Sequence, residues 1–300
     1  MMENYATYYE ILQPLIQSAL RSPGLLAPNE FNLARYSLNQ HTRNRLLDPD
    51  ICALEDYLID HSALPGKESN LELLRAFGDV IYTICHHEEI PLQDSYKNME
   101  WLLAWLNMHH PPAFFGEDPD SPLQMLQMAA AVGLGVWAGV FSQIQSGTGT
   151  LLELANSPLW RVRDTAAMGL HRMLSLSWET TLRRLRFHAM QANSLEWGAI
   201  ISSISYLPLL EGQPFRVLDV LDLQQQALRF VSQSQEAHPL LREALSRCIN
   251  VAVEALPSVG LAQLRAWAAW PHVGVKEIIR DSLAGLAHWS DEVDRIAQQL

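Results

Sequence analysis

The chain has 300 residues, of which 48% are hydrophobic and 18% charged, and this is enough apolar material to bury a sizeable core. The composition excludes a chain that is mainly disordered, and 15 glycines with 16 prolines exclude collagen-like and low-complexity classes. The three cysteines, Cys52, Cys85 and Cys248, stand far apart and outside any CxxC spacing. We therefore expect reduced thiols rather than a disulfide framework.

The negative charge is concentrated in the N-terminal half. The formal net charge is −12; residues 1–156 hold 19 acidic and seven basic residues, and residues 157–300 hold 14 of each. Such an acidic region disfavours general binding to nucleic acid and to anionic membranes. The first residues lack the basic and compact apolar segments of a signal peptide, so the expected location is the cytoplasm.

Apolar residues recur at three-and-four spacing in nearly every long segment, and no two alternating β runs are joined by a tight turn. The sequence therefore predicts an all-α fold. The first expected helices cover about residues 8–20, the segment DICALEDYLIDHS from Asp50, and about Asn70–His86. We expect residues 1–115 to form an acidic helical region, either as a cap or as divergent repeats.

The stretch Ser121–Leu152 carries no charge and contains MAAAVGLGVWAGVF, in which Gly135 and Gly139 have GxxxG spacing. Acidic residues border it instead of Lys or Arg, and three glutamines interrupt its ends. We therefore expect no membrane span but a helix buried on all sides within the protein. Ser146–Thr150, with the sequence SGTGT, is expected to be a flexible turn between two helices.

A local pattern recurs over residues 116–300: a short polar or proline-bearing turn, then a helix with small and branched residues on one stripe. The pattern starts at Ser121, Ser157, Ser194, His238 and Pro271, at intervals of 36, 37, 44 and 33 residues. Such intervals are typical of stacked helical hairpins, in which each pair needs neighbours to bury its apolar face. The expected partner helices are Thr148–Ala155, Trp178–Ala192, Pro214–Ser232 and Val259–Trp270, followed by a polar terminal helix, Asp291–Leu300.

The segment SPLWRVRDTAAMGLHRML, residues 157–174, resembles the second helix of a HEAT repeat. Pro158 occupies the turn, Val162-Arg163 the family's VR position, and Ala166-Ala167 the small pair. Residues 238–256 repeat the pattern loosely, with Leu241-Arg242 in place of the VR pair. The resemblance implies an α-solenoid of stacked antiparallel helical hairpins, with a HEAT-like array over residues 116–300 whose second helices line a concave groove.

In such an array, the exposed face of the second helix is where a partner would be met. The expected groove residues are Trp160, Arg161, Asp164, Met168 and Arg172, and a basic patch of Arg163, Arg183, Arg184 and Arg186 would extend it. We therefore expect a non-enzymatic scaffold with a protein partner, no catalytic residues and no cofactor. The alternative interpretation of these arginines is structural: packing against neighbouring repeats, or a solvated helix face.

A helical-repeat fold also occurs in DNA glycosylases that remove alkylated purines, where Trp, Asp and Arg side chains hold the damaged nucleotide. Trp160, Arg163 and Asp164 are of these types, so nucleic-acid binding or glycosylase-like repair is the alternative function, although the acidic charge opposes it. His86-His87-Glu88-Glu89 and His109-His110 have ligand chemistry but lack the spacing of a zinc or iron site. No metal is expected.

Overall fold

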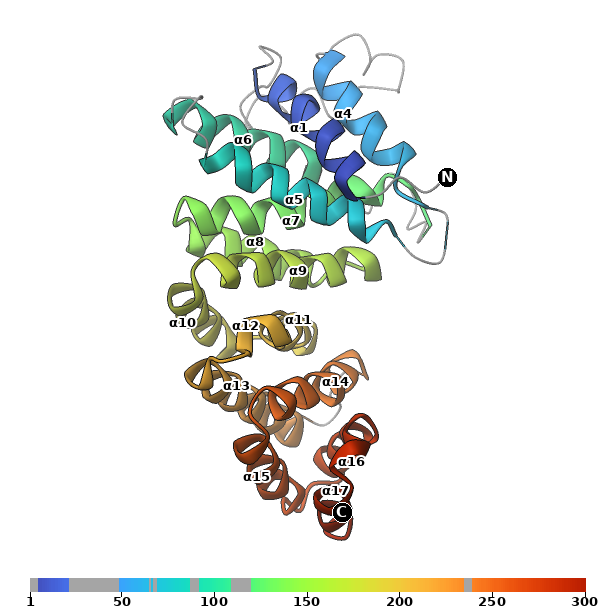
Figure 1. Ribbon diagram of the computed structural model, residues 1–300, viewed down its shortest axis with the longest axis vertical. Coiled ribbons are helices and arrows are strands. Elements are labelled where there is room, and N and C mark those ends of the chain that lie inside the picture. Colours follow the sequence, from blue (N-terminus) through green and yellow to red (C-terminus); the bar gives the residue numbers. More distant parts are fainter. Residues whose placement is uncertain are drawn as a thin grey trace. The chain divides into compact units, whose positions relative to one another are not determined.

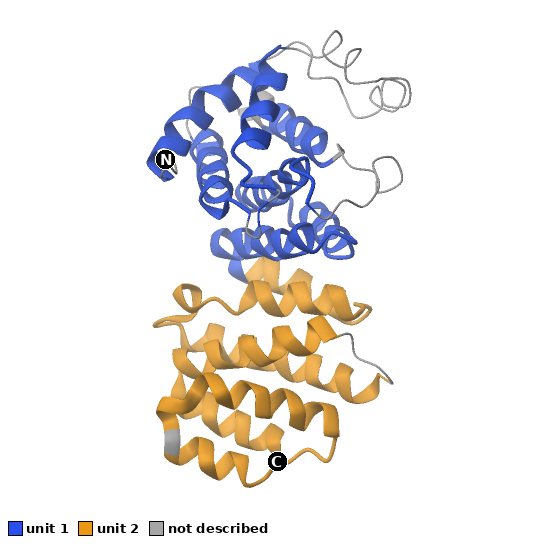
Figure 2. Cartoon of the chain, turned by 90° about the vertical axis from the view of Figure 1, so that its right-hand side faces the viewer, with its two compact units in different colours: residues 1–178 blue, residues 179–300 orange. Residues whose placement is uncertain are grey.

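The computed structural model describes residues 5–21, 49–64, 66, 69–86, 92–108, 120–234 and 239–300, and all regular structure within these ranges is helical. The predicted all-α fold is thus confirmed for the described chain. Two compact units are formed, residues 1–178 and residues 179–300 (Figure 2). The expected division at residue 115 concerned the point at which recognisable repeats begin, and it stays a prediction.

The helices of unit 1 are arranged in two rows (Figure 1). In one row α1, α5, α7 and α9 each pack on the next helix, and α4, α6 and α8 pack against that row. Unit 1 therefore has the arrangement of stacked helical hairpins. The bounds are α1 (Tyr5–Arg21), α4 (Pro49–Asp60), α5 (Leu71–His86), α6 (Leu92–Met108), α7 (Gln124–Val140), α8 (Ile144–Leu154) and α9 (Trp160–Leu176).

Helix α7 is formed by the uncharged stretch and is the central helix of unit 1. It is buried almost continuously from Gln124 to Ala138, because α5, α6, α8 and α9 all pack against it. The expectation of a helix buried on all sides is confirmed. Within the described residues, no helix combines the length and the hydropathy needed to cross a membrane.

Helices α7 and α9 pack most closely at two glycines, Gly135 and Gly169. A Cβ atom at Gly135 would lie 1.9 Å from the carbonyl oxygen of Gly169, and a Cβ atom at Gly169 would lie 2.4 Å from the carbonyl oxygen of Ala131. Only glycine allows two backbones to approach so closely. The GxxxG spacing continues the contact, since a Cβ atom at Gly139 would lie 2.8 Å from Leu176 Cδ1. In this protein the motif packs two helices of unit 1 against each other.

The turn expected at Ser146–Thr150 is wrong, because these residues belong to α8. A Cβ atom at Gly147 would lie 2.5 Å from Ala138 Cβ and 2.9 Å from Met173 Cε, so the glycine allows α8 to approach its neighbours. Thr148 is buried, and its hydroxyl donates to Met173 Sδ at 3.7 Å. Gly147 and Thr148 therefore serve close helix packing and not a change in chain direction.

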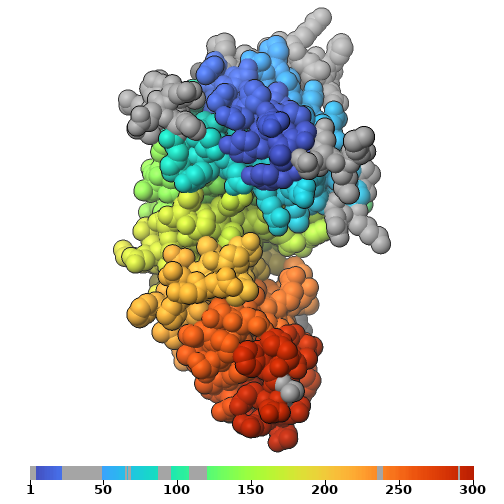
Figure 3. Space-filling view, viewed as in Figure 1, coloured from blue at the N-terminus to red at the C-terminus, as the bar shows by residue number. Residues whose placement is uncertain are grey.

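Unit 2 repeats the two-row arrangement. Helices α11, α14 and α16 pack in one row, α13 and α15 pack against it, and η1 and α17 close the C-terminal end. The bounds are α10 (Trp178–Ala189), α11 (Ser194–Ile204), α12 (Leu207–Leu210), α13 (Pro214–Gln233), α14 (Pro239–Ala255), α15 (Pro257–Ala268), α16 (Val273–Leu283), η1 (Ala284–Trp289) and α17 (Ser290–Ala297). Within each unit the stacking follows chain order, from blue to yellow-green in unit 1 and from gold to red in unit 2 (Figure 3).

Local sequence signals account for where these helices begin. Each of the five repeat starts leads into a helix, namely α7, α9, α11, α14 and α16, and the expected partner helices correspond to α8, α10, α13 and α15. Asn193 caps α11 by accepting from the backbone N–H groups of Leu195 and Glu196, while the Glu196 carboxylate accepts from the Asn193 N–H at 2.9 Å. Proline opens α13, α14 and α15, where its missing N–H costs nothing.

Candidate functional site

The six arginines among the predicted groove and basic-patch residues divide between the two units, with three on α9 and three on α10. Each group is therefore described within its own unit.

Arg161 is an interior residue of unit 1, with only 3% of its surface exposed. Its guanidinium donates to Asp120 Oδ1 at 3.3 Å and to the carbonyl oxygen of Gly66 at 2.9 Å, and it lies 4.5 Å from the centroid of the Trp160 ring. The sequence placed Arg161 on an exposed face of the groove. Because α7 and α8 both pack on α9, the buried arc of α9 is wider than one stripe and includes Arg161 and Thr165.

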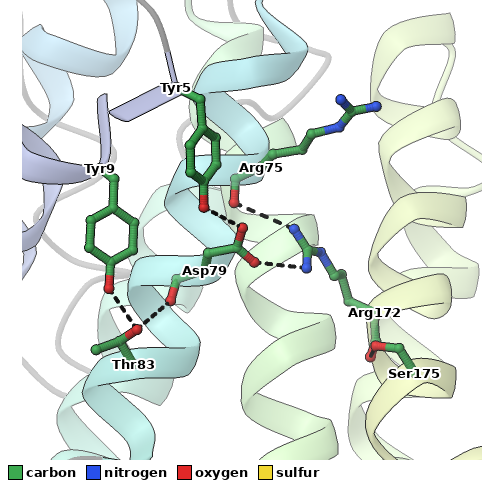
Figure 4. A network of polar contacts seen from close by, with 7 residues as sticks. All are labelled: Tyr5, Tyr9, Arg75, Asp79, Thr83, Arg172 and Ser175. Atoms are coloured by element: carbon green, nitrogen blue, oxygen red, sulfur yellow. Dashed lines mark hydrogen bonds and ion pairs between the residues drawn. The ribbon is translucent and has the colours of Figure 1, made fainter. Parts of the chain in front are cut away.

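Arg172 belongs to a polar network that joins α1, α5 and α9 at the surface of unit 1 (Figure 4). Its guanidinium forms an ion pair with Asp79 Oδ1 at 2.8 Å and reaches the carbonyl oxygen of Arg75 at 3.5 Å. The second carboxylate oxygen of Asp79 accepts from the Tyr5 hydroxyl at 2.7 Å. Arg172 therefore uses its charge within unit 1.

The same network extends along α5 to a second tyrosine. The hydroxyls of Tyr9 and Thr83 are 2.7 Å apart, and Thr83 donates to the carbonyl oxygen of Asp79 at 3.0 Å (Figure 4). Burial, followed by the hydrogen bond and charge of Asp79, raises the pKa of the Tyr5 hydroxyl to about 12. Tyr5 is thus a neutral hydrogen-bond donor at physiological pH.

The other predicted residues of α9 lie nearer to solvent. Trp160 is 43% exposed, Asp164 is exposed and Met168 is half-buried. Arg163, in the VR position, donates to the carbonyl oxygens of Ser157 and Pro158 at 2.8 and 2.9 Å. It therefore holds the turn before its own helix.

On α10 the three arginines differ in what surrounds them. Arg186 forms ion pairs with Asp219 at 2.9 Å and Asp222 at 3.2 Å on α13. The Arg184 guanidinium lies 5.0 Å from the centroid of the Phe187 ring. Arg183 is exposed and has no ion pair with any described residue.

Four exposed apolar side chains stand on or directly after the two helices that the Arg186 ion pairs join: Phe187 is 55% exposed, Met190 72%, Phe215 82% and Leu218 49%. We call them the α10–α13 surface. Exposed apolar residues scattered singly are common, but a group of them on two adjoining helices is typical of an interaction site. The sequence analysis missed Phe215, Leu218 and Met190.

A signal for part of this surface is present in the sequence. The buried stripe of α13 includes Val217, Leu221, Gln224 and Leu228, at helical spacing. Phe215 and Leu218 stand outside that stripe, so their exposure could have been predicted from periodicity.

His188, which is on α10, does not add positive charge to this helix. Burial and the neighbouring charge of Arg184 lower the pKa of the His188 imidazole, against an opposing effect of Glu196. The positive charge of α10 therefore comes from its arginines.

The residues that the structure describes contain no group of three or more His, Cys, Asp or Glu side chains positioned to hold a metal ion. His86 ends α5, and its Nδ1 lies 3.0 Å from the carbonyl oxygen of Tyr82. The remaining residues of the two histidine motifs, residues 87–89 and His109-His110, lie outside the described residues.

No family model matches this chain, and no curated protein matches it. Two solved structures are similar, both crystal structures of engineered proteins studied by the Northeast Structural Genomics Consortium. The first has 13% sequence identity and a TM-score of 0.31, and the match covers 76% of this chain and 97% of that one. The second has 11% identity and a TM-score of 0.29, over 98% of this chain and 79% of that one.

The fold and the candidate site together define a class: an all-α protein of stacked, repeat-like helical hairpins. Its candidate site is a group of exposed apolar and arginine side chains on two helices of unit 2.

Proposed function

We propose that this protein is a HEAT-like repeat scaffold that binds another protein through the α10–α13 surface. The observation that carries the proposal is the exposure of Phe187, Met190, Phe215 and Leu218 on two helices tied together by Arg186. Aromatic and long apolar side chains supply most of the binding energy of protein interfaces. Stacked hairpins hold such anchors in fixed positions, because each hairpin is braced by its neighbours.

Two arginines support the HEAT-like assignment. Arg163 of the VR pair fixes the turn that precedes its helix. Arg242, in the corresponding position of a later repeat, forms an ion pair with Glu277 on α16, the next helix in the row. Both are structural uses of a repeated position.

The proposed surface is on α10 and α13 instead of on the groove face of α9. Of the expected groove residues, Arg161 is buried and Arg172 is paired with Asp79, so neither presents an uncommitted charge to a partner. Arg163 is committed to its turn, which leaves glycosylase-like chemistry at Trp160 and Asp164 with less support.

The test compares three tagged proteins in their own host: wild type, Phe187→Ser/Phe215→Ser, and the control Val273→Ser. Val273 is 71% exposed on α16, and the adjacent Gly274 approaches Val231 near the end of α13 opposite Phe215. All three should unfold at similar temperatures, because exposed substitutions change stability by only about 0.5 kcal/mol. Quantitative mass spectrometry after affinity purification measures the bound proteins.

We expect at least one stoichiometric protein to be retained by wild type and by Val273→Ser and to be lost from the double variant. An identical set of bound proteins in all three samples would contradict the proposed surface. Nucleic acid that elutes with salt, in place of a protein, would favour the alternative function.

A further inference from the structure

The four side chains of the α10–α13 surface belong to two longer helical stripes. On α10 the stripe contains Arg183, Phe187 and Met190, at positions i, i+4 and i+7; Met190 follows the last helical residue directly. On α13 it contains Phe215, Leu218, Asp222, Gln226 and Arg229, at positions i, i+3, i+7, i+11 and i+14. Residues at these spacings lie on one face of a helix.

Ion pairs join the two helices that carry these stripes. The Arg186 guanidinium contacts carboxylates of both Asp219 and Asp222, which are one turn apart on α13. Asp222 also accepts from Gln226 Nε2 at 3.0 Å. The polar groups at the centre of the surface thus satisfy one another, and none of them requires a partner.

Two further arginines on these helices, unlike Arg186, have no carboxylate partner among the described residues. Arg183 and Arg229 are exposed and form no ion pair with a described residue, and Arg184 stacks on Phe187. Helix α10 carries three arginines and one glutamate, in a chain with a net charge of −12. The surface therefore combines exposed apolar side chains with two exposed arginines, Arg183 and Arg229, that form no ion pair with a described residue.

We infer that the occupant of this surface is an acidic amphipathic segment of another protein, with apolar side chains on Phe187, Phe215 and Leu218 and carboxylates toward Arg183 and Arg229. This inference rests on the proposed function and specifies the partner's chemistry. Carboxylates satisfy uncompensated guanidinium groups, and apolar side chains cover the exposed rings. A nucleic acid fits less well, because its continuous row of phosphates would also meet Asp219 and Asp222.

The probes are three fluorescein-labelled synthetic peptides of about 18 residues, long enough to form a helix with one apolar face. The first has leucines on one face and glutamates elsewhere, the second replaces each glutamate by lysine, and the third keeps the acidic composition but scatters the leucines. Fluorescence anisotropy measures the affinity of each peptide for the full-length protein. A labelled single-stranded DNA serves as the competing ligand class.

We expect the acidic amphipathic peptide to bind about tenfold or more tightly than the other two, with an affinity that falls as salt is added. Arg183→Glu/Arg229→Glu should weaken it about tenfold, and Phe187→Ser/Phe215→Ser should abolish it. The matched control is Arg247→Glu/Arg280→Glu, which reverses two exposed arginines on α14 and α16 and should leave the affinity unchanged.

Equal binding of the acidic and basic peptides, lost only in the phenylalanine variant, would overturn the acidic preference and leave the surface itself as a binding site. Tighter binding of the DNA at the same residues would overturn the inference in favour of a nucleic acid. Failure of all three peptides would also overturn it, whereas the proposed function is decided separately by the proteins that the phenylalanine variant loses in the host.

Discussion

Arg161 and Arg172 contribute unequally to the free energy of unfolding, because one is buried and the other is partly exposed to water. The Arg161 guanidinium is buried and donates to the Gly66 carbonyl, and a buried polar group that loses its hydrogen-bond partner costs about 1–3 kcal/mol. The half-exposed pair of Arg172 and Asp79 contributes only about 0–1 kcal/mol, because water competes for both charges. The main effect of the second pair is therefore on the chemistry of its neighbour Tyr5.

The raised pKa of Tyr5 predicts a loss of stability in alkaline solution. The unfolded chain loses this proton near pH 10 and the folded protein near pH 12, so the Tyr5 contribution is complete below pH 10 and disappears as pH rises to 12. Thermal unfolding measured at a series of pH values should show this decline in wild type and a smaller one in Tyr5→Phe. Asp79→Asn should bring the Tyr5 pKa nearer to 10 while leaving it raised, because burial, the larger cause, persists. Parallel pH curves for wild type and Tyr5→Phe would contradict the assignment.

At the scale of elements, contact between α7 and α9 depends on having no side chain at two positions. The Gly135 and Gly169 backbones touch each other's helices directly, so no rotamer change can make room for a methyl group. Other glycines in helices face open space, and a Cβ atom at Gly149 or Gly198 would meet nothing within 4 Å. Substitution by alanine should therefore lower the free energy of unfolding at Gly135 and Gly169 and raise it at Gly149 and Gly198.

We expect Gly135→Ala and Gly169→Ala each to lower the free energy of unfolding by about 3 kcal/mol, because the helices must move apart. Gly149→Ala and Gly198→Ala should raise it by about 0.5–1 kcal/mol, because alanine favours a helix over the unfolded chain. Urea denaturation of the four variants measures both effects. Similar losses at all four positions would mean that helix crossing is not what Gly135 and Gly169 provide.

The features that could be predicted from the sequence are those that depend on neighbouring residues in the chain. Prolines and periodicity are local, and they predicted the five repeat helices α7, α9, α11, α14 and α16, their partners α8, α10, α13 and α15, and the terminal helix α17. The short helix α12 was not predicted. Burial of Arg161 arises from two other helices packing on α9, and the partner of Gly135 is 34 positions away at Gly169, so neither followed from one segment. The turn predicted for the SGTGT stretch was wrong for the same reason, since Gly147 packs against Ala138 of α7 and Met173 of α9.

At the scale of the whole molecule, each compact unit has its own rows of helices. In unit 2, ion pairs repeat between neighbouring hairpins: Arg186 with Asp219, Arg242 with Glu277, and Arg265 with Glu292. Stability in such an arrangement is a sum of contacts between neighbours, so a local defect weakens the helices nearest to it.

This organisation predicts which helices lose protection against hydrogen exchange when one contact is weakened. Gly169→Ala should accelerate amide hydrogen exchange in α7 and α9 while leaving the protection of α14 and α16 unchanged, because those helices pack within unit 2. Hydrogen exchange with peptide-level mass spectrometry distinguishes the two regions. Equal acceleration throughout the chain would show that the protein unfolds as one cooperative whole.

The side chains of the α10–α13 surface are 49–82% exposed, so substitutions there should disturb the fold less than substitutions of Gly135 and Gly169. Met190 and Phe215 are 72% and 82% exposed, so substitutions there should cost little stability, and under the proposed function they would change which partner is bound. Under the proposed function, related proteins could acquire new partners by changing a few exposed positions, and a designed library that randomises the same positions would select for altered binding.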